Sequence, residues 1–203
     1  MNIIPTEQEV VSILRETGAL RDGHFLYPSG LHSNEYLQVP LALRYYQYQK
    51  TLSVGLSRLL RANPEIRAIV NELSIVTPMT GGLPVAYGVT EALRANQVYW
   101  AERQADEPLH FRQYLEQHEG EQVVLVDDIL RTGKNLSELK GLLESHGATV
   151  VGLAVVIYQP TPDTFDFGNL PLYYLAKLDA SYYADAEHCE LCRQGTPIEK
   201  VCF

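Results

Sequence analysis

The sequence predicts an α/β fold in which a parallel sheet is flanked by helices. Short apolar runs, typical of strands buried on both faces, alternate with amphipathic helical patterns between about residues 66 and 158. Strands that alternate with helices form parallel sheets with right-handed crossovers, and ligands bind outside the carboxyl ends of such strands. A chain of 203 residues is long enough for one well-buried domain, so we expect a single domain over residues 1–203.

The N-terminal part of the chain predicts a helix followed by an irregular segment. Thr6 and Glu9 have the spacing of a capping box, so a first helix is expected at about residues 6–17. Residues 18–33 are rich in turn residues and predict an extended, partly exposed segment, with a short strand after it at residues 36–39.

The rest of the chain predicts a second helix and then the alternating part. Leucines recur on one face of residues 45–62, and Pro64 is expected to end that helix. The later elements are expected to be a strand within residues 66–76, a helix at 83–95, strands at 97–101 and 123–126, a helix at 136–145 and a strand at 149–158.

Composition excludes several classes of function. The chain has 25 acidic and 16 basic residues, a net charge of −9, which argues against a broad nucleic-acid-binding surface. Three cysteines, an odd number, do not suggest a disulfide framework. No run resembles a signal peptide or a membrane span, so we expect a cytoplasmic protein that does not bind membranes.

Residues 123–135, VVLVDDILRTGKN, carry the clearest chemical signal in the chain. An acid pair, Asp127 and Asp128, follows four apolar residues, and a pair placed there is costly unless it meets a ligand or a metal. The Gly-containing turn that follows precedes a helix, and free N–H groups at a helix N-terminus bind anions. Adjacent acids also occur in solvated turns, but this context predicts a site for a sugar phosphate.

This motif resembles the signature with which type I phosphoribosyltransferases bind phosphoribosyl pyrophosphate. The resemblance implies that Asp127 and Asp128 bind the ribose hydroxyls and that Mg²⁺ is held mainly by the substrate, with no permanent protein ligands. It implies that the 5′-phosphate is bound by the following turn, in which Asn135 replaces the more usual Ser or Thr. The turn consists of Arg131, Thr132, Gly133, Lys134 and Asn135.

A second glycine-containing turn follows the first long strand. Taken alone, Thr80, Gly81 and Gly82 are typical of any strand-to-helix connection. In the family that the chain resembles, the turn at this place contacts pyrophosphate through backbone N–H groups. Glycine would allow the close approach that such contacts need.

Residues 99–114 form a polar segment between two apolar strands, which by itself indicates a surface loop. The resemblance implies a lid that closes over pyrophosphate, often from the neighbouring subunit of a homodimer. Its cations here would be Arg103, His110 and Arg112, because no lysine lies between Lys50 and Lys134.

Residues 23–36, GHFLYPSGLHSNEY, resemble the N-terminal segment of orotate phosphoribosyltransferases, which forms part of a hood over the base. The resemblance implies that Phe25, Ser29 and Tyr36 contribute to base binding, although Pro28 replaces a usual Lys or Thr. A core is therefore expected at about residues 50–158, with a hood built from residues 18–45 and 159–203.

The tail contains Cys189-x-x-Cys192 and resembles the ending of one orotate phosphoribosyltransferase subgroup. This spacing is half of a zinc-ribbon motif, but the only candidate ligands nearby in sequence are His188 and Cys202. We therefore expect neither a metal site nor a redox dithiol in the tail.

The acceptor base is less well specified than the donor. Relatives in the subgroup have an arginine for the orotate carboxylate where this chain has Gln159, which cannot form a bidentate charged pair. The resemblance implies transfer of a phosphoribosyl group to orotate, giving orotidine 5′-monophosphate and pyrophosphate in pyrimidine synthesis. Two alternatives are a phosphoribosyltransferase for another base and a non-catalytic regulator that binds phosphoribosyl pyrophosphate.

Overall fold

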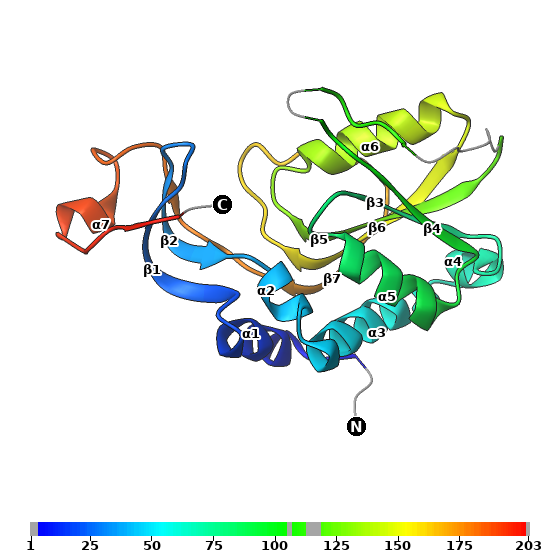
Figure 1. Ribbon diagram of the computed structural model, residues 1–203, viewed down its shortest axis with the longest axis horizontal. Helices are drawn as coiled ribbons and strands as arrows, with labels where there is room; N and C mark the ends of the chain where they lie inside the picture. Colours follow the sequence, from blue (N-terminus) through cyan, green and yellow to red (C-terminus); the bar gives the residue numbers. More distant parts are fainter. Residues whose placement is uncertain (1–3, 105–106, 113–118, 202–203) are drawn as a thin grey trace.

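The computed structural model describes residues 4–104, 107–112 and 119–201, and the larger of its two sheets has five strands (Figure 1). These strands are β3 (Ser74–Pro78), β4 (Gln97–Ala101), β5 (Gln122–Leu130), β6 (Thr149–Tyr158) and β7 (Leu172–Lys177). Their spatial order is β4-β3-β5-β6-β7, and every neighbouring pair runs parallel. The expected α/β fold with a parallel sheet is confirmed.

Helices cover both faces of this sheet (Figure 1). On one face, Val123 and Leu125 of β5 pack in a cluster with leucines of α6 (Lys134–Ser145). On the other, Val124 and Val126 pack in a cluster with residues of the remaining long helices. Those helices are α1 (Glu7–Glu16), α3 (Tyr46–Ala62) and α5 (Leu83–Leu93). The strict alternation explains why β5 reads as continuously apolar in the sequence.

Two short helices revise the expected boundaries. The strand expected within residues 66–76 is β3, which begins at Ser74, while residues 66–69 belong to the helix α4 (Pro64–Ile69). The other short helix, α2 (Pro40–Leu43), precedes α3. The Asn63 side chain accepts from the N–H groups of Glu65 and Ile66, so Asn63 and Pro64 begin a new helix instead of only ending α3. No helix in the described part of the chain is both long and apolar enough to cross a bilayer.

The strand that carries the acid pair is longer than its sequence predicts. β5 continues through Asp127 and Asp128 to Leu130, which pairs with Tyr158 of β6 and is buried. The next helix begins at Lys134, two residues earlier than expected. Asp127 and Asp128 therefore lie within the paired part of β5, near its carboxyl end. The N-terminus of α6 follows only a few residues later.

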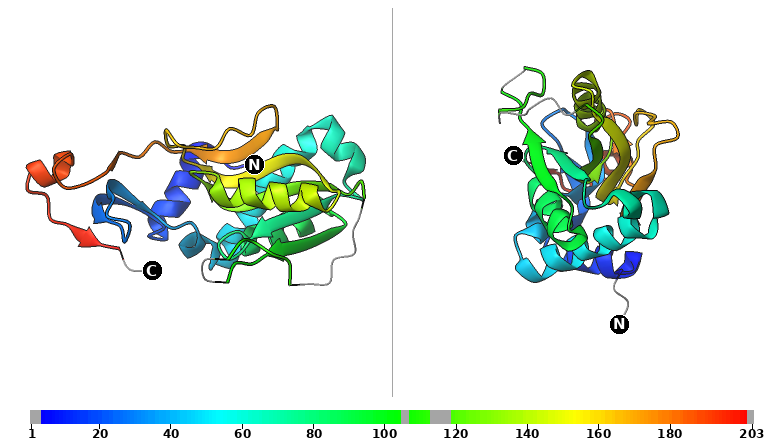
Figure 2. Two further views of the ribbon diagram at one scale, coloured as in Figure 1. Left: turned by 90° about the horizontal axis from the view of Figure 1, so that it is seen from above. Right: turned by 90° about the vertical axis from the view of Figure 1, so that its right-hand side faces the viewer.

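A smaller sheet forms the hood, at one end of the larger sheet (Figure 2). Its strands are β1 (Leu20–Leu26), β2 (His32–Leu37), β8 (Tyr182–Tyr183) and β9 (Glu199–Lys200), and the short helix α7 (Glu190–Arg193) lies in the tail between β8 and β9. Their spatial order is β8-β2-β1-β9. Residues 18–33, expected to be an extended segment, thus contribute most of a β-hairpin, and the strand expected at residues 36–39 instead ends at Leu37 and begins at His32.

The C-terminal part of the hood is shorter than expected. The interpretation of residues 159–203 as hood is wrong for β7, which pairs with β6 as an edge strand of the larger sheet. Its burial is mixed, with Leu175 and Ala176 buried and Tyr174 exposed, so the sequence offers no clean strand pattern. Only the chain after β7 pairs with the β1–β2 hairpin.

Candidate active site

The acid pair at the end of β5 is buried in the described structure. Asp127 is 9% exposed and Asp128 is 8% exposed, and the N–H of Asp128 donates to Oδ1 of Asp127 at 2.9 Å. Burial is the largest cause that raises the pKa of each carboxyl group, and the neighbouring Asp128 raises the pKa of Asp127 further. Such a pair favours a ligand that brings hydroxyl donors or a cation.

The turn after β3 lies directly against the two acids. A Cβ atom added to Gly81 would lie 2.7 Å from Oδ1 of Asp128, and one added to Gly82 would lie 2.1 Å from Oγ1 of Thr77 and 2.7 Å from Oδ1 of Asp127. The peptide bond between Met79 and Thr80 is cis. The two glycines are therefore required by lack of space next to Thr77, Asp127 and Asp128, while their contact with pyrophosphate stays a prediction.

The N-terminus of α6 faces the same region. Gly133 is its N-cap with φ +74°, and the first helical bond runs from the N–H of Ser137 to the Gly133 carbonyl. The Gly133 cap has no side chain, and the N–H of Lys134 makes only a long contact of 3.4 Å to Oγ1 of Thr132. The first-turn N–H groups and the helix dipole thus form a site suited to an anion.

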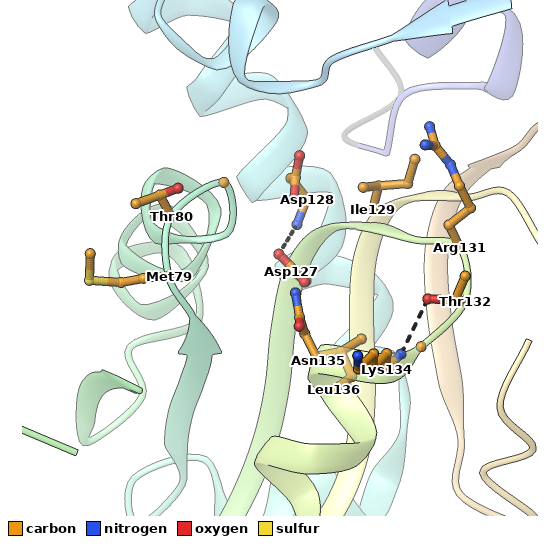
Figure 3. Close-up of a pocket in the computed structure, with 12 residues that line it drawn as sticks. Met79, Thr80, Asp127, Asp128, Ile129, Arg131, Thr132, Lys134, Asn135 and Leu136 are labelled. Atoms are coloured by element: carbon orange, nitrogen blue, oxygen red, sulfur yellow. Dashed lines mark hydrogen bonds between the residues drawn. The ribbon is translucent and has the colours of Figure 1, made fainter. Parts of the chain in front are cut away.

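The acids and both turns line one cavity of about 530 Å³. Figure 3 shows Asp127 and Asp128 between Thr80 on one side and the Arg131–Thr132 segment on the other. The cationic lining residues are Arg131 and Lys134. The sequence-predicted residues on its wall are Thr80, Gly81, Asp127, Asp128, Arg131, Thr132, Gly133, Lys134 and Asn135.

The family of this chain follows from its relatives. Residues 65–166 match the phosphoribosyl transferase domain family. An orotate phosphoribosyltransferase of Thermotoga maritima is 34% identical over 191 residues, which cover 94% of this chain and 96% of that protein. The chain belongs to the phosphoribosyltransferase family, in its orotate branch.

Solved structures of phosphoribosyltransferases share this fold. The orotate phosphoribosyltransferase of Aeropyrum pernix has a TM-score of 0.66 at 20% identity, over 83% of this chain and 93% of that one. The Mycobacterium tuberculosis enzyme in complex with inorganic phosphate has a TM-score of 0.63 at 18% identity, over 85% and 95%. The type I phosphoribosyltransferase fold predicted from the sequence is confirmed.

Gln159, expected to contact the base, lies behind the cavity wall of this phosphoribosyltransferase. It is fully buried, and its Oε1 accepts from Nε of Arg131 at 2.9 Å and from the Tyr182 hydroxyl at 3.0 Å. Its Nε2 donates to Oε2 of Glu35 at 3.4 Å. The side chain that reaches the cavity is Arg131, and Gln159 orients it from the end of β6.

Two members of this network, Glu35 and Tyr182, were not found by sequence reasoning. Both come from hood strands, and the Arg131 guanidinium lies 5.6 Å from the centre of the Tyr182 ring. Burial raises the pKa of Tyr182 to about 12, so its hydroxyl remains a donor to Gln159 at neutral pH. The network joins the hood to the carboxyl ends of the larger sheet.

The expected lid cations do not line the cavity in this structure. Arg103 pairs with Glu138 of α6, and Nε of Arg112 lies 3.0 Å from Oε2 of Glu102. His110 is partly exposed, with Nδ1 3.4 Å from the Pro108 carbonyl. Their action on pyrophosphate stays a prediction, and Gln113 and Tyr114 of the same segment lie outside the described residues.

The hood residues expected at the base occupy other positions. Phe25 and Tyr36 pack against each other with ring centres 5.6 Å apart, and the Arg21 guanidinium lies 5.1 Å from each ring centre. With Val201 they form the small core of the hood. Ser29 is exposed in the turn between β1 and β2. The structure brings none of Phe25, Ser29 and Tyr36 to the cavity wall.

Proposed function

We propose that this protein transfers the phosphoribosyl group of phosphoribosyl pyrophosphate to orotate, giving orotidine 5′-monophosphate and pyrophosphate. The observation that carries the proposal is the cavity that joins a buried acid pair to the uncapped N-terminus of α6. Carboxylates accept hydrogen bonds from sugar hydroxyls, and helix N–H groups bind phosphate. Those two features match the two ends of a ribose 5-phosphate.

Each part of the cavity has a defined task in this reaction. Asp127 and Asp128 hold the ribose hydroxyls, while the turn from Thr132 to Asn135 anchors the 5′-phosphate, so the sugar cannot shift during the reaction. The C1′–O bond to pyrophosphate breaks with oxocarbenium character, and a ring nitrogen of the base attacks C1′ from the opposite face. The buried carboxylates stabilise the positive charge that develops on the ribose.

The acid pair also suits Mg²⁺, which takes hard oxygen ligands and is often shared with substrate phosphates. The ion would be held mainly by oxygens of the substrate, next to Asp127 and Asp128, and two buried carboxylates with raised pKa values favour a nearby cation. Bound with the substrate, Mg²⁺ would supply positive charge to the leaving pyrophosphate.

Turnover of orotate tests the proposal directly. Purified protein with orotate, phosphoribosyl pyrophosphate and Mg²⁺ is expected to release pyrophosphate, and removal of Mg²⁺ with a chelator is expected to stop the release. Because Gln159 replaces the arginine of relatives, other purines and pyrimidines belong in the same assay. Binding of phosphoribosyl pyrophosphate with turnover of a different base alone would reject orotate, and binding without turnover of any base would favour a regulator.

We infer that Arg131 provides the cation for the orotate carboxylate that Gln159 cannot provide. Arg131 lines the cavity, and Gln159 fixes its Nε, so the rest of its guanidinium can meet an anionic base. Arg131→Ala is expected to lower kcat/KM for orotate by about 10²–10³-fold, the range for losing a buried charged hydrogen bond. The KM for phosphoribosyl pyrophosphate should change much less.

Steady-state kinetics with each substrate varied in turn check this prediction. Lys140→Ala, which removes an α6 cation paired with Glu144, is the matched control and should leave both KM values unchanged. Gln159→Met should raise the KM for orotate by a smaller factor than Arg131→Ala. An equal rise in both KM values for Arg131→Ala would place this residue at the phosphate instead of the base.

We further propose that the protein acts as a homodimer in which Arg103, His110 and Arg112 act on pyrophosphate across the interface, as the resemblance implies. Mixing an Asp128→Asn chain with an Arg103→Ala chain tests this, because a hybrid dimer would regain one intact site. A cytoplasmic location stays a prediction.

A further inference from the structure

Four side chains that the proposed reaction does not use meet in the hood. They are His24 of β1, His32 of β2, Cys189 at the N-cap of α7 and Cys192 within α7. One nitrogen or sulfur atom of each lies within 4.8 Å of the corresponding atoms of the other three. His24, His32 and Cys189 are buried, and Cys192 is partly buried.

The backbone of the hood explains this convergence. The β1–β2 register shifts between Asp22 and Phe25, so His24 lies in a bulge, and bulges redirect side chains. His32 pairs with Leu26 on the other side of the same hairpin. Cys189 and Cys192 are three residues apart at one helical turn, so their sulfur atoms point to the same side.

The nitrogen–sulfur distances fit a tetrahedral metal centre. Zinc bonds of about 2.0–2.1 Å to nitrogen and about 2.3 Å to sulfur place a nitrogen and a sulfur ligand about 3.5 Å apart at tetrahedral angles. Sγ of Cys192 lies 3.6 Å from Nε2 of His24 and 3.5 Å from Nδ1 of His32. Sγ of Cys189 lies 3.5 Å from Nε2 of His24, and the two ring nitrogens are 2.9 Å apart.

A second contact prepares His24 to act as a ligand. Its Nδ1 lies 2.8 Å from the Thr196 carbonyl oxygen, which can only accept, so Nδ1 carries the proton. The lone pair of Nε2 then points into the cluster, and a backbone carbonyl in this position is typical of metal-bound histidines. Neither Cys189 nor Cys192 is in a disulfide.

We propose that His24, His32, Cys189 and Cys192 bind one structural Zn²⁺ ion. Four protein ligands leave no open position, and none of them lines the cavity that holds the acid pair, so the ion is structural and not catalytic. The sequence alone does not predict this site, because the only candidate ligands close to the cysteine pair in sequence are His188 and Cys202. His188 instead pairs with Asp185, and Cys202 lies outside the described residues.

The position of the ion indicates its task. In the described part of the chain, the hood has two strands of only two residues and a core of three buried side chains with Tyr27 and Leu41 packed against them. So small a core gains stability from a further cross-link. An ion here ties the tail to the β1–β2 hairpin. The same sheet carries Glu35 and Tyr182, which reach Gln159, so the ion would stabilise the wall next to Arg131.

Metal analysis of the untagged full-length protein tests this proposal. Elemental analysis after gel filtration is expected to find one zinc per chain, and Cys192→Ser and His32→Ala are expected to lose it. His188→Ala and Cys202→Ser are matched controls and should keep it. Replacement by Co²⁺ should give strong visible bands and a thiolate-to-cobalt charge-transfer band, the signature of tetrahedral sulfur ligation.

Measurements on the wild-type protein test the zinc site even if a variant fails to fold. A wild-type chain that neither contains zinc nor takes up one equivalent of Zn²⁺ or Co²⁺ would overturn the proposal, and so would a disulfide between Cys189 and Cys192 in the intact mass. Chelation is expected to lower the melting temperature and expose both thiols to a thiol reagent. Unchanged thiol reactivity after complete zinc removal would also contradict it.

Discussion

Replacing Asp127 or Asp128 by asparagine is expected to remove most of the transferase activity while raising the stability of the free protein. Asparagine keeps the shape but loses the charge that holds the ribose hydroxyls and opposes the developing oxocarbenium charge. The loss in kcat/KM should be about 10²–10³-fold, the range for removing one stabilising polar group from a transition state. The Asp127 variant should show the larger gain in stability, because burial and the neighbouring Asp128 raise the pKa of Asp127 more than the pKa of Asp128 is raised.

The effect on stability follows from the direction of the pKa shifts. Burial raises the folded-state pKa of both carboxyls above the unfolded value, so the folded chain binds more protons between those two pKa values. Wild-type stability therefore falls as pH rises through this window, and the charged pair destabilises the free protein at neutral pH. Asparagine removes that penalty, with an expected gain on the order of 1 kcal/mol at pH 7.

Urea unfolding measured over a series of pH values, together with kinetics at one pH, checks both halves of this prediction. The control is Asp163→Asn, which changes an exposed aspartate and should alter neither activity nor the pH dependence. A loss of activity accompanied by a loss of stability, instead of the expected gain, would mean that the acids serve the fold and not the ligand.

The sequence predicts the larger sheet well where apolar runs have clear ends. Strands β4 and β6 have the bounds expected from their residues, because polar residues and prolines flank them. The end of β5 was misjudged because two acids interrupt the apolar pattern, although the ladder to β6 continues through them. A buried strand can contain polar residues where they bind a ligand. A strand boundary predicted only from the end of an apolar run does not take such residues into account.

In the candidate site, too, some residues could be predicted from the sequence and others could not. The acid pair and the phosphate turn are contiguous in sequence, so their residues and their shared cavity could be predicted together. The contacts of Gln159 with Glu35 span 124 residues, and that of Cys189 with His24 spans 165 residues. No local pattern reports such pairs. Phe25 and Tyr36 were expected at the base because a resemblance aligns positions without fixing where side chains point.

Replacing Gly82 by alanine is expected to disable the site by steric conflict alone. The backbone of Gly82 has φ −73° and ψ −20°, which alanine adopts freely, so backbone strain plays no part. The new methyl group would lie 2.1 Å from Oγ1 of the fully buried Thr77 and 2.7 Å from Oδ1 of Asp127. We expect a loss of about 1–3 kcal/mol in stability from overpacking, and a larger loss in binding of phosphoribosyl pyrophosphate because Asp127 is displaced.

Calorimetric binding of phosphoribosyl pyrophosphate and urea unfolding of the same samples check this prediction. The matched control is Gly141→Ala in α6, where a Cβ would meet no atom within 4 Å and should add about 0.5–1 kcal/mol of stability. The double variant Thr77→Ala/Gly82→Ala removes the 2.1 Å conflict but keeps the one with Asp127. It should therefore regain stability without regaining ligand affinity. Recovery of both would show that Thr77, and not the acid pair, sets the need for glycine at this turn.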